Sequence, residues 1–284
     1  MASDLVAGAG TLYVVATPLG HLGDLTARAA DLLRRVPVVA AEDTRRTLGL
    51  LNHLGARPTL LSFHAHSPEH RVERLLGELR AGRDVALVTD AGTPGISDPG
   101  AELVAAVRGA GMSVVPLPGA AAVTAALSAS GLPADRYLFL GFLPRKGAER
   151  ARLIAGAAAS EWPVAFYEAP TRVQALLADL AAAAGGERHV VVARELTKLH
   201  EEFRTGTLAE LAGYYEEHEP RGEFTVVLAG GAPPHDAPAT DEEIAERARA
   251  LLAEGRTRRD VVERLAPGAG RPRKEVYRIV MDLS

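Results

Sequence analysis

The sequence contains no cysteine, which excludes disulfides, cysteine-ligated zinc or iron–sulfur sites and a thiol nucleophile. It has no uninterrupted run of about 18 apolar residues, so we expect no membrane-spanning helix. The first basic residue is Arg28, and a start without Lys or Arg predicts no signal peptide. Since 47% of the 284 residues are hydrophobic and 24% are charged, we expect a soluble globular protein in the cytoplasm.

Lysine is scarce, because only Lys146, Lys198 and Lys274 occur among 32 basic residues. Because arginine is otherwise strongly preferred in this chain, each lysine is a candidate for a position whose function arginine could not fulfil. The formal net charge is −4, yet residues 255–278 carry eight basic and three acidic residues, a local charge of +5. This excess predicts either a nucleic-acid-binding face or a solvated helical surface.

Residues 1–133 read as an N-terminal α/β domain in which short apolar runs alternate with amphipathic stretches. The runs predict strands at 12–16, 36–40, 59–63, 85–89 and 113–117. The stretches predict helices at 24–35, 43–54, 68–80, 99–109 and 119–130, with Ser67 and Asp98 as N-caps before a proline. Such alternation is typical of a mostly parallel sheet with helices on both faces and a ligand site at the carboxyl ends of the strands.

Residues 134–230 are expected to form a second, mixed α/β domain. Its strands are predicted at 137–142, 164–167, 190–194, 202–205 and 224–228, and its helices at 147–159, 171–184 and 207–217. The Gly- and Pro-rich stretch 231–240 predicts a linker. Beyond it, 241–284 reads as a basic helical appendage with helices at 241–254, 257–265 and 272–282.

Three turns of the first domain follow predicted strands, at 15–20, 89–100 and 116–121. The loop 89–100 holds three glycines, which let a ligand approach the backbone, and two prolines, which stiffen it. It lacks the Gly-Lys-Ser/Thr of a P-loop and the Gly-x-Gly-x-x-Gly of a dinucleotide site. We expect the three turns to meet at one sheet edge and to form a ligand site there.

Segments 12–20 (LYVVATPLG), 40–45 (AAEDTR), 88–100 (VTDAGTPGISDPG), 166–172 (FYEAPTR) and 194–198 (RELTK) occur in a characteristic order. Together they resemble the ribosomal RNA small subunit methyltransferase I family. The resemblance implies the tetrapyrrole methylase fold, in which two α/β domains clamp S-adenosylmethionine between them, commonly in a homodimer. It also implies 2′-O-methylation of a cytidine ribose in 16S ribosomal RNA. We expect this RNA as the partner within the small ribosomal subunit, while free RNA stays open as the substrate.

Carried over by position, the resemblance implies cofactor contacts, mostly through the backbone, at Pro18, Ala91, Gly92, Thr93, Ile96, Ala121, Ala122, Glu168 and Leu196. The loop departs from the Gly-Gly-Asp-Pro of corrin- and sirohaem-forming relatives, because this chain has Ala-Gly-Thr-Pro at 91–94 and its acidic residue at 90.

A side-chain base would help to remove the ribose proton. The matched motifs suggest five candidates for it: Glu42, Asp43, Asp90, Glu168 and Lys198. Lys198 could act as a neutral base only if burial lowered its pKa. For Glu42 and Asp43 the alternative is a helix cap with an ion pair to a following arginine.

Phosphate contacts are predicted in two places. The loop after 137–142 offers Arg145 and Lys146, although a helix start with exposed charge would look the same. The appendage offers Arg256, Arg258, Arg259, Arg271, Arg273 and Lys274, although it could instead be a dimer-stabilising tail.

The histidines His64, His66 and His70 have a ligand-like spacing, but we expect a substrate-side loop and no metal site there. Two other functions stay open on the same fold. One is a tetrapyrrole or diphthine-type methylase, and the other is a non-enzymatic RNA-binding assembly factor.

Overall fold

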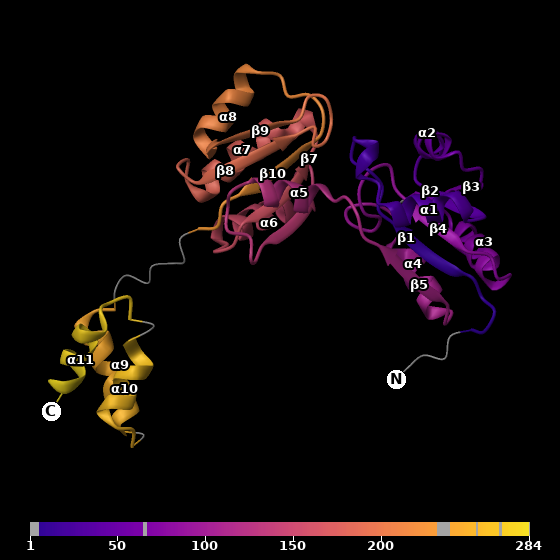
Figure 1. Cartoon of the computed structure of the whole chain (residues 1–284). Coiled ribbons are helices and arrows are strands. Elements are labelled where there is room, and N and C mark those ends of the chain that lie inside the picture. The colour runs from indigo at the N-terminus through magenta and orange to yellow at the C-terminus, as the bar shows by residue number, and fades with distance from the viewer. Residues whose placement is uncertain (1–5, 65–66, 232–238, 254, 267–268, 284) are drawn as a thin grey trace. The chain divides into compact units, whose positions relative to one another are not determined.

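The computed structural model describes residues 6–64, 67–231, 239–253, 255–266 and 269–283 of the chain. By its internal contacts the chain divides into two compact units, Met1–Gly230 and Gly231–Ser284. The first unit contains two five-stranded sheets and the second contains three helices (Figure 1).

The first sheet is entirely parallel, with the strand order β3-β2-β4-β1-β5. Its strands are β1 (Thr11–Val15), β2 (Val38–Ala41), β3 (Thr59–Ser62), β4 (Val85–Val88) and β5 (Ser113–Leu117). Both faces are covered, because alternate residues of β4 join different cores: Val85 and Leu87 on one side, Ala86 and Val88 on the other. The α/β class and the parallel first sheet predicted from the sequence are therefore confirmed.

Four helices cover this sheet, and a short 3-10 helix, η1 (Leu22–Asp24), follows β1. On one face lie α3 (Glu69–Arg80) and α4 (Ala101–Gly109), and on the other lie α1 (Ala27–Arg35) and α2 (Thr44–Leu54).

The N-caps predicted for α3 and α4 are wrong, because Pro68 and Gly100 occupy the cap positions. Ser67 instead accepts a hydrogen bond from the backbone N–H of His64 (2.8 Å). Asp98 stands two residues before the cap of α4 and lines a cavity.

The second sheet is mixed, with the order β6-β7-β10-β8-β9. Its strands are β6 (Leu138–Phe142), β7 (Val164–Glu168), β8 (His189–Arg194), β9 (Glu202–Thr207) and β10 (Phe224–Leu228). One face packs against α6 (Ala148–Ala159), α7 (Pro170–Ala184) and α8 (Leu208–Glu217). The opposite face packs against α5 (Ala122–Ala129), which precedes this sheet in the chain and contributes Val123, Ala126 and Leu127 to a core with Ala165 and Val227.

The second unit is a small helical bundle with its own apolar core. It consists of α9 (Asp241–Ala253), α10 (Arg258–Leu265) and α11 (Arg273–Met281). The core includes Ile244, Val261, Val276 and Val280. Among the helices of the described residues, none combines the length and the apolar character that crossing a membrane requires.

Candidate active site

The three glycine- and proline-bearing turns meet at one sheet edge, as the sequence predicted. They follow β1, β4 and β5, which are neighbours in the parallel sheet. Thr17 and Gly92 exchange backbone hydrogen bonds of 2.8 and 3.0 Å, which ties the first turn to the second. The Thr93 hydroxyl donates to the Ala120 carbonyl (3.0 Å), which ties the second turn to the third.

Glycine is required where the first and third turns cross. A Cβ atom on Gly119 would lie 2.8 Å from the Cβ of Ala16, closer than two carbon atoms can approach. The turns therefore pack backbone against backbone, and they leave their outer surface to a cavity.

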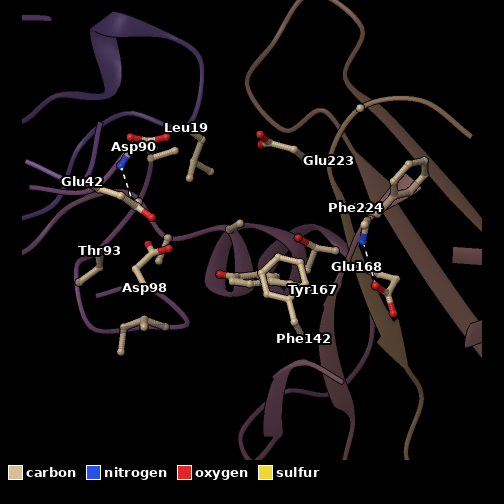
Figure 2. Close-up of a pocket in the computed structure, with 18 of the residues that line it drawn as sticks. Leu19, Glu42, Asp90, Thr93, Asp98, Phe142, Tyr167, Glu168, Glu223 and Phe224 are labelled. Atoms are coloured by element: carbon tan, nitrogen blue, oxygen red, sulfur yellow. Dashed lines mark hydrogen bonds between the residues drawn. The ribbon is translucent and has the colours of Figure 1, made fainter. Parts of the chain in front are cut away.

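A cavity of about 410 Å³ opens between these turns and the second sheet. Figure 2 shows Glu42, Asp90, Asp98 and Thr93 on one side and Tyr167, Glu168, Glu223 and Phe224 on the other. Among the residues that the structure describes, its lining combines five carboxylates with one cationic side chain, Arg46. The cavity therefore suits a ligand that carries a positive charge.

On the first-sheet side, two of the carboxylates are held by their neighbours. Glu42 Oε2 accepts from the backbone N–H of Asp90 (3.3 Å), and Asp90 Oδ1 accepts from the backbone N–H of Asp43 (3.1 Å). Arg46 pairs with Asp90 at 3.4 Å. Asp43 does not line the cavity. It caps α2 and pairs with Arg45, which is the alternative to a catalytic role that the sequence left open.

Asp98 is the titratable group most altered by this environment. Burial, together with the nearby carboxylates of Glu42 and Asp90, raises the pKa of Asp98 to about 6, and Thr89 opposes this rise in part. Charged carboxylates that are removed from water next to like charges are unfavourable, which explains the direction. Asp98 therefore changes its protonation state close to neutral pH.

Glu168 is the most deeply buried acid of the site, with 2% of its surface exposed. Its Oε1 accepts from the backbone N–H of Ala169 (2.9 Å) and pairs with Arg172 Nε (3.1 Å). Its Oε2 is buried without a hydrogen-bond partner. Because a buried unpaired acceptor is unfavourable, this oxygen indicates a place for a hydrogen-bond donor from a ligand.

The second-sheet wall also contains aromatic rings. Tyr167 packs edge-on against Phe139 (4.8 Å between ring centres) and Phe142 (5.6 Å). Its hydroxyl oxygen accepts from the backbone N–H of Val123 at the start of α5 (3.1 Å), and burial raises the pKa of Tyr167. Helix α5 is thereby fixed to the cavity wall.

Lys198 does not meet the condition for a neutral base. It pairs with Glu195 (2.9 Å) and Glu223 (3.0 Å) and does not itself line the cavity. Burial lowers the pKa of Lys198, but these hydrogen bonds outweigh burial, and the pKa lies above its ordinary value. The ammonium group instead holds the carboxylate of Glu223, which does line the cavity.

The turn that carries Lys198 also reaches the first sheet's loops. Thr197 Oγ1 accepts from the backbone N–H of His21 (3.2 Å). A Cβ atom on Gly20 would lie 2.3 Å from Cγ of Lys198, so only glycine lets the two loops come this close. Glu195 and Thr197 have left-handed backbone angles (φ 51° and 64°), a strained conformation that is common at functional sites.

Seven of the nine residues to which the resemblance assigns cofactor contacts line the cavity: Ala91, Gly92, Thr93, Ile96, Ala121, Ala122 and Glu168. The other two do not line it. Leu196 is 8% exposed and packs in the core under α5, and Pro18 lies half-buried in the turn after β1.

The lining residues that sequence reasoning missed are Leu19, Arg46, Asp98, Phe142, Tyr167, Ala169, Pro170, Gly222, Glu223, Phe224 and Thr225. Asp98 and Tyr167 stand inside the segments 88–100 and 166–172 that were already singled out, and this membership was the available signal. For Glu223 and Phe224 no local signal exists, because only the pairing of β10 between β7 and β8 brings them to the cavity.

Some residues predicted to contact RNA are exposed, and others already form hydrogen bonds or ion pairs within the protein. Arg145 and Lys146 are exposed and follow Phe142, a lining residue, by three and four positions. In the helical unit, Arg258 donates to the carbonyls of Met281 (2.8 Å) and Leu283 (2.5 Å).

The other residues of the helical unit that were predicted to contact RNA fall into three groups. Arg271 pairs with Asp241 and Glu275, so it is committed within the unit. Arg259 and Arg273 both lie near Glu263, at 3.5 and 3.6 Å, and remain largely exposed. Lys274 is also exposed, whereas Arg256 already interacts with another group of the protein.

No group of three or more His, Asp or Glu residues placed to hold a metal ion occurs in the described part of the chain. Of the three spaced histidines, His66 lies outside the described residues.

Residues 11–212 match the family model of the tetrapyrrole (corrin/porphyrin) methylases. The chain is 47% identical over 275 residues to ribosomal RNA small subunit methyltransferase I from Synechocystis sp., covering 96% of this chain and 98% of the relative. The protein of the same name from Xylella fastidiosa strain Temecula1 is 45% identical over 270 residues, covering 94% and 98%.

Solved structures share the fold at low sequence identity. A cobalt precorrin-4 methyltransferase superposes with a TM-score of 0.62 at 19% identity, covering 77% of this chain and 94% of the other. Uroporphyrin-III C-methyltransferase from Thermus thermophilus, in complex with S-adenosylhomocysteine, superposes with a TM-score of 0.58 at 21% identity, covering 78% and 97%. These likenesses confirm the two-domain methylase-like fold predicted from the sequence.

Proposed function

Because the chain belongs to the ribosomal RNA small subunit methyltransferase I family of tetrapyrrole methylases, we propose that it methylates the 2′-hydroxyl of a cytidine in 16S ribosomal RNA, using S-adenosylmethionine. The observation that carries the proposal is the cavity with five carboxylates and one arginine, beside the turns of the first sheet. S-adenosylmethionine supplies an electrophilic methyl group on a positively charged sulfonium. An acidic cavity attracts such a cation.

The lining fits the other parts of this cofactor as well. Apolar and aromatic side chains, among them Leu19, Ile96 and Tyr167, suit an adenine ring. The backbone of Ala91 and Gly92 is open to a ligand, since Gly92 has a left-handed φ of 85°. The unpaired Oε2 of Glu168 is available to accept a hydrogen bond from the amino group of a methionine moiety.

RNA is proposed to approach over two basic surfaces. Arg145 and Lys146 follow the cavity-lining residue Phe142 closely in the chain, and they would contact phosphates close to the reacting nucleotide. The helical unit would add contacts through its exposed cations, chiefly Arg259, Arg273 and Lys274. Arg258 and Arg271 would stabilise the unit and act on RNA only indirectly.

Deleting residues 241–284 tests the role of the helical unit. We expect weaker RNA binding and a flatter dependence of the binding constant on salt, because fewer phosphates are neutralised, while S-adenosylhomocysteine binding stays unchanged. The double substitution Arg273→Glu with Lys274→Glu should reproduce most of the effect in the full chain. Unchanged RNA affinity in both variants would favour a role of this unit in dimer stability.

The remaining expectations are also proposals. We propose a homodimer, a substrate presented within the small ribosomal subunit, and a cytoplasmic location where that substrate is found. The domain limits 1–133, 134–230, 231–240 and 241–284 are proposed as well.

The decisive experiment incubates the purified protein with S-adenosylmethionine and small ribosomal subunits that lack the modification. Mass spectrometry of ribonuclease fragments should then show one added methyl on a cytidine ribose of 16S RNA. If the protein binds S-adenosylmethionine but transfers no methyl to RNA, the proposal fails, and tetrapyrroles become the substrates to test. If it binds no cofactor, an RNA-binding assembly role is favoured.

A further inference from the structure

A second cavity, of about 520 Å³, adjoins the first and shares two of its lining residues. Glu42 and Asp98 line both cavities. The rest of the second lining comes from the loop and helix start at 95–102, which bear one further acid, Glu102. The shared residues therefore stand between the cavity assigned to the methyl donor and a separate space on the other side of the loop.

Of the acids at this junction, Asp98 is the least engaged, because its hydrogen-bond partner is the Thr89 side chain and not a cation or a backbone N–H. The Glu42 carboxylate accepts a hydrogen bond from the backbone N–H of Asp90. The Asp90 carboxylate accepts one from the backbone N–H of Asp43 and forms an ion pair with Arg46. Among the described residues, Asp98 forms no ion pair. Its carboxylate is only half-buried, so a ligand in either cavity can reach it.

The loop that carries Asp98 is held in one position by its neighbours. Ser97 has a left-handed φ of 63°, and its hydroxyl lies against Gly141 of β6, where a Cβ atom would come within 2.5 Å. Gly100 follows with φ 138°, and a Cβ atom there would meet Leu87 at 2.8 Å. Such fixed, strained backbone holds the Asp98 carboxylate in place.

We propose that the acceptor ribose occupies the second cavity and that Asp98 receives the proton of its 2′-hydroxyl. This inference rests on the proposed function. The hydroxyl oxygen forms the bond to the methyl carbon, and the carbon–sulfur bond breaks with its electron pair moving to sulfur, which leaves a neutral thioether. The proton passes to a carboxylate oxygen of Asp98 and then to water.

The charges around Asp98 agree with this role. Burial, Glu42 and Asp90 raise the pKa of Asp98 to about 6, so it is ionised above that pH yet more basic than an ordinary aspartate. Glu102 faces the same second cavity, and Arg46 partly neutralises Asp90. Tyr167, on the opposite wall, stays neutral because its pKa is raised.

Single-turnover methylation by Asp98→Asn tests the inference, with Asp31→Asn, the same substitution at an exposed residue of α1 that lines neither cavity, as the matched control. A general base contributes about 10²–10⁴-fold, so we expect the rate with Asp98→Asn to fall at least 10²-fold. Binding of S-adenosylhomocysteine should stay within about threefold, which a general structural defect would not allow. The control should retain its rate.

The pH profile supplies a second readout. The wild-type rate should rise with pH up to about 6 and then level off, because Asp98 must lose its proton first. The residual activity of Asp98→Asn should lack this rise. A rate within tenfold of wild type for Asp98→Asn, or an equal loss in Asp31→Asn, would overturn the inference alone. A wild-type protein that methylates no RNA would overturn the proposed function and this inference together.

Discussion

Replacing Glu168 by glutamine separates the structural role of this carboxylate from its role in ligand binding. The Glu168 side chain is fully buried and pairs with Arg172, which is 24% exposed. Breaking a buried ion pair costs about 3–5 kcal/mol. Arg172 keeps a second hydrogen bond, to the Leu143 carbonyl (2.6 Å), so we expect the lower end, about 3 kcal/mol, in the free energy of unfolding.

The effect on ligand binding should be additional. Glutamine keeps the shape of Glu168 but cannot accept hydrogen bonds at both positions, so the cofactor's donor loses a charged partner. Such a bond is worth about 1.5–3 kcal/mol, which corresponds to about 10- to 150-fold weaker binding of S-adenosylhomocysteine. Chemical denaturation measures the first effect, and isothermal titration calorimetry measures the second.

Asp179→Asn provides the matched control. Asp179 on α7 pairs with Arg150, which is 10% exposed, at 2.7 Å and away from the cavity. This variant should also be less stable, yet it should bind S-adenosylhomocysteine like wild type. If Glu168→Gln bound the ligand as tightly as Asp179→Asn does, the assignment of Glu168 to the cofactor would be refuted.

Two further substitutions probe the loops around the cavity. Lys198→Met should raise KM for S-adenosylmethionine more than it lowers kcat, because Glu223 loses the partner that holds it at the cavity. Lys198→Arg keeps a cation at this position and should restore most of the loss. Equal effects of the two substitutions would contradict this positioning role. Gly119→Ala should destabilise the protein by about 1–3 kcal/mol, since its Cβ would meet Ala16, whereas Gly109→Ala on α4 has open space and should stabilise slightly in thermal unfolding.

The strands of the first sheet were predictable because each is a short apolar run, and the central strands β2 and β4 are buried along their whole length. The strand 113–117 coincides with β5 to the residue. Helix starts were less predictable, because a polar residue before a proline fits a cap equally well whether or not it has a tertiary partner. Ser67 and Asp98 both have other environments, a backbone N–H in one case and a cavity in the other.

The site was predictable where the turns follow neighbouring strands. Strand alternation alone was enough to bring Gly92 and Gly119 to the same edge. The opposite wall was not predictable, since Glu223 reaches the cavity only through a mixed strand order and an ion pair with Lys198. The role of Lys198 as a base required a lowered pKa. Glu195 and Glu223, which raise that pKa instead, lie 3 and 25 positions away in the sequence.

Helix α5 joins the two sheets in a way that limits how the chain can be divided. It follows the last strand of the first sheet, yet its apolar side covers a face of the second sheet. A fragment that ended at residue 133 would carry this helix into water, and a fragment that began at 134 would expose the sheet face that the helix covers. Neither half could then be expressed or exchanged as a separate folded module, in keeping with the single compact unit formed by residues 1–230.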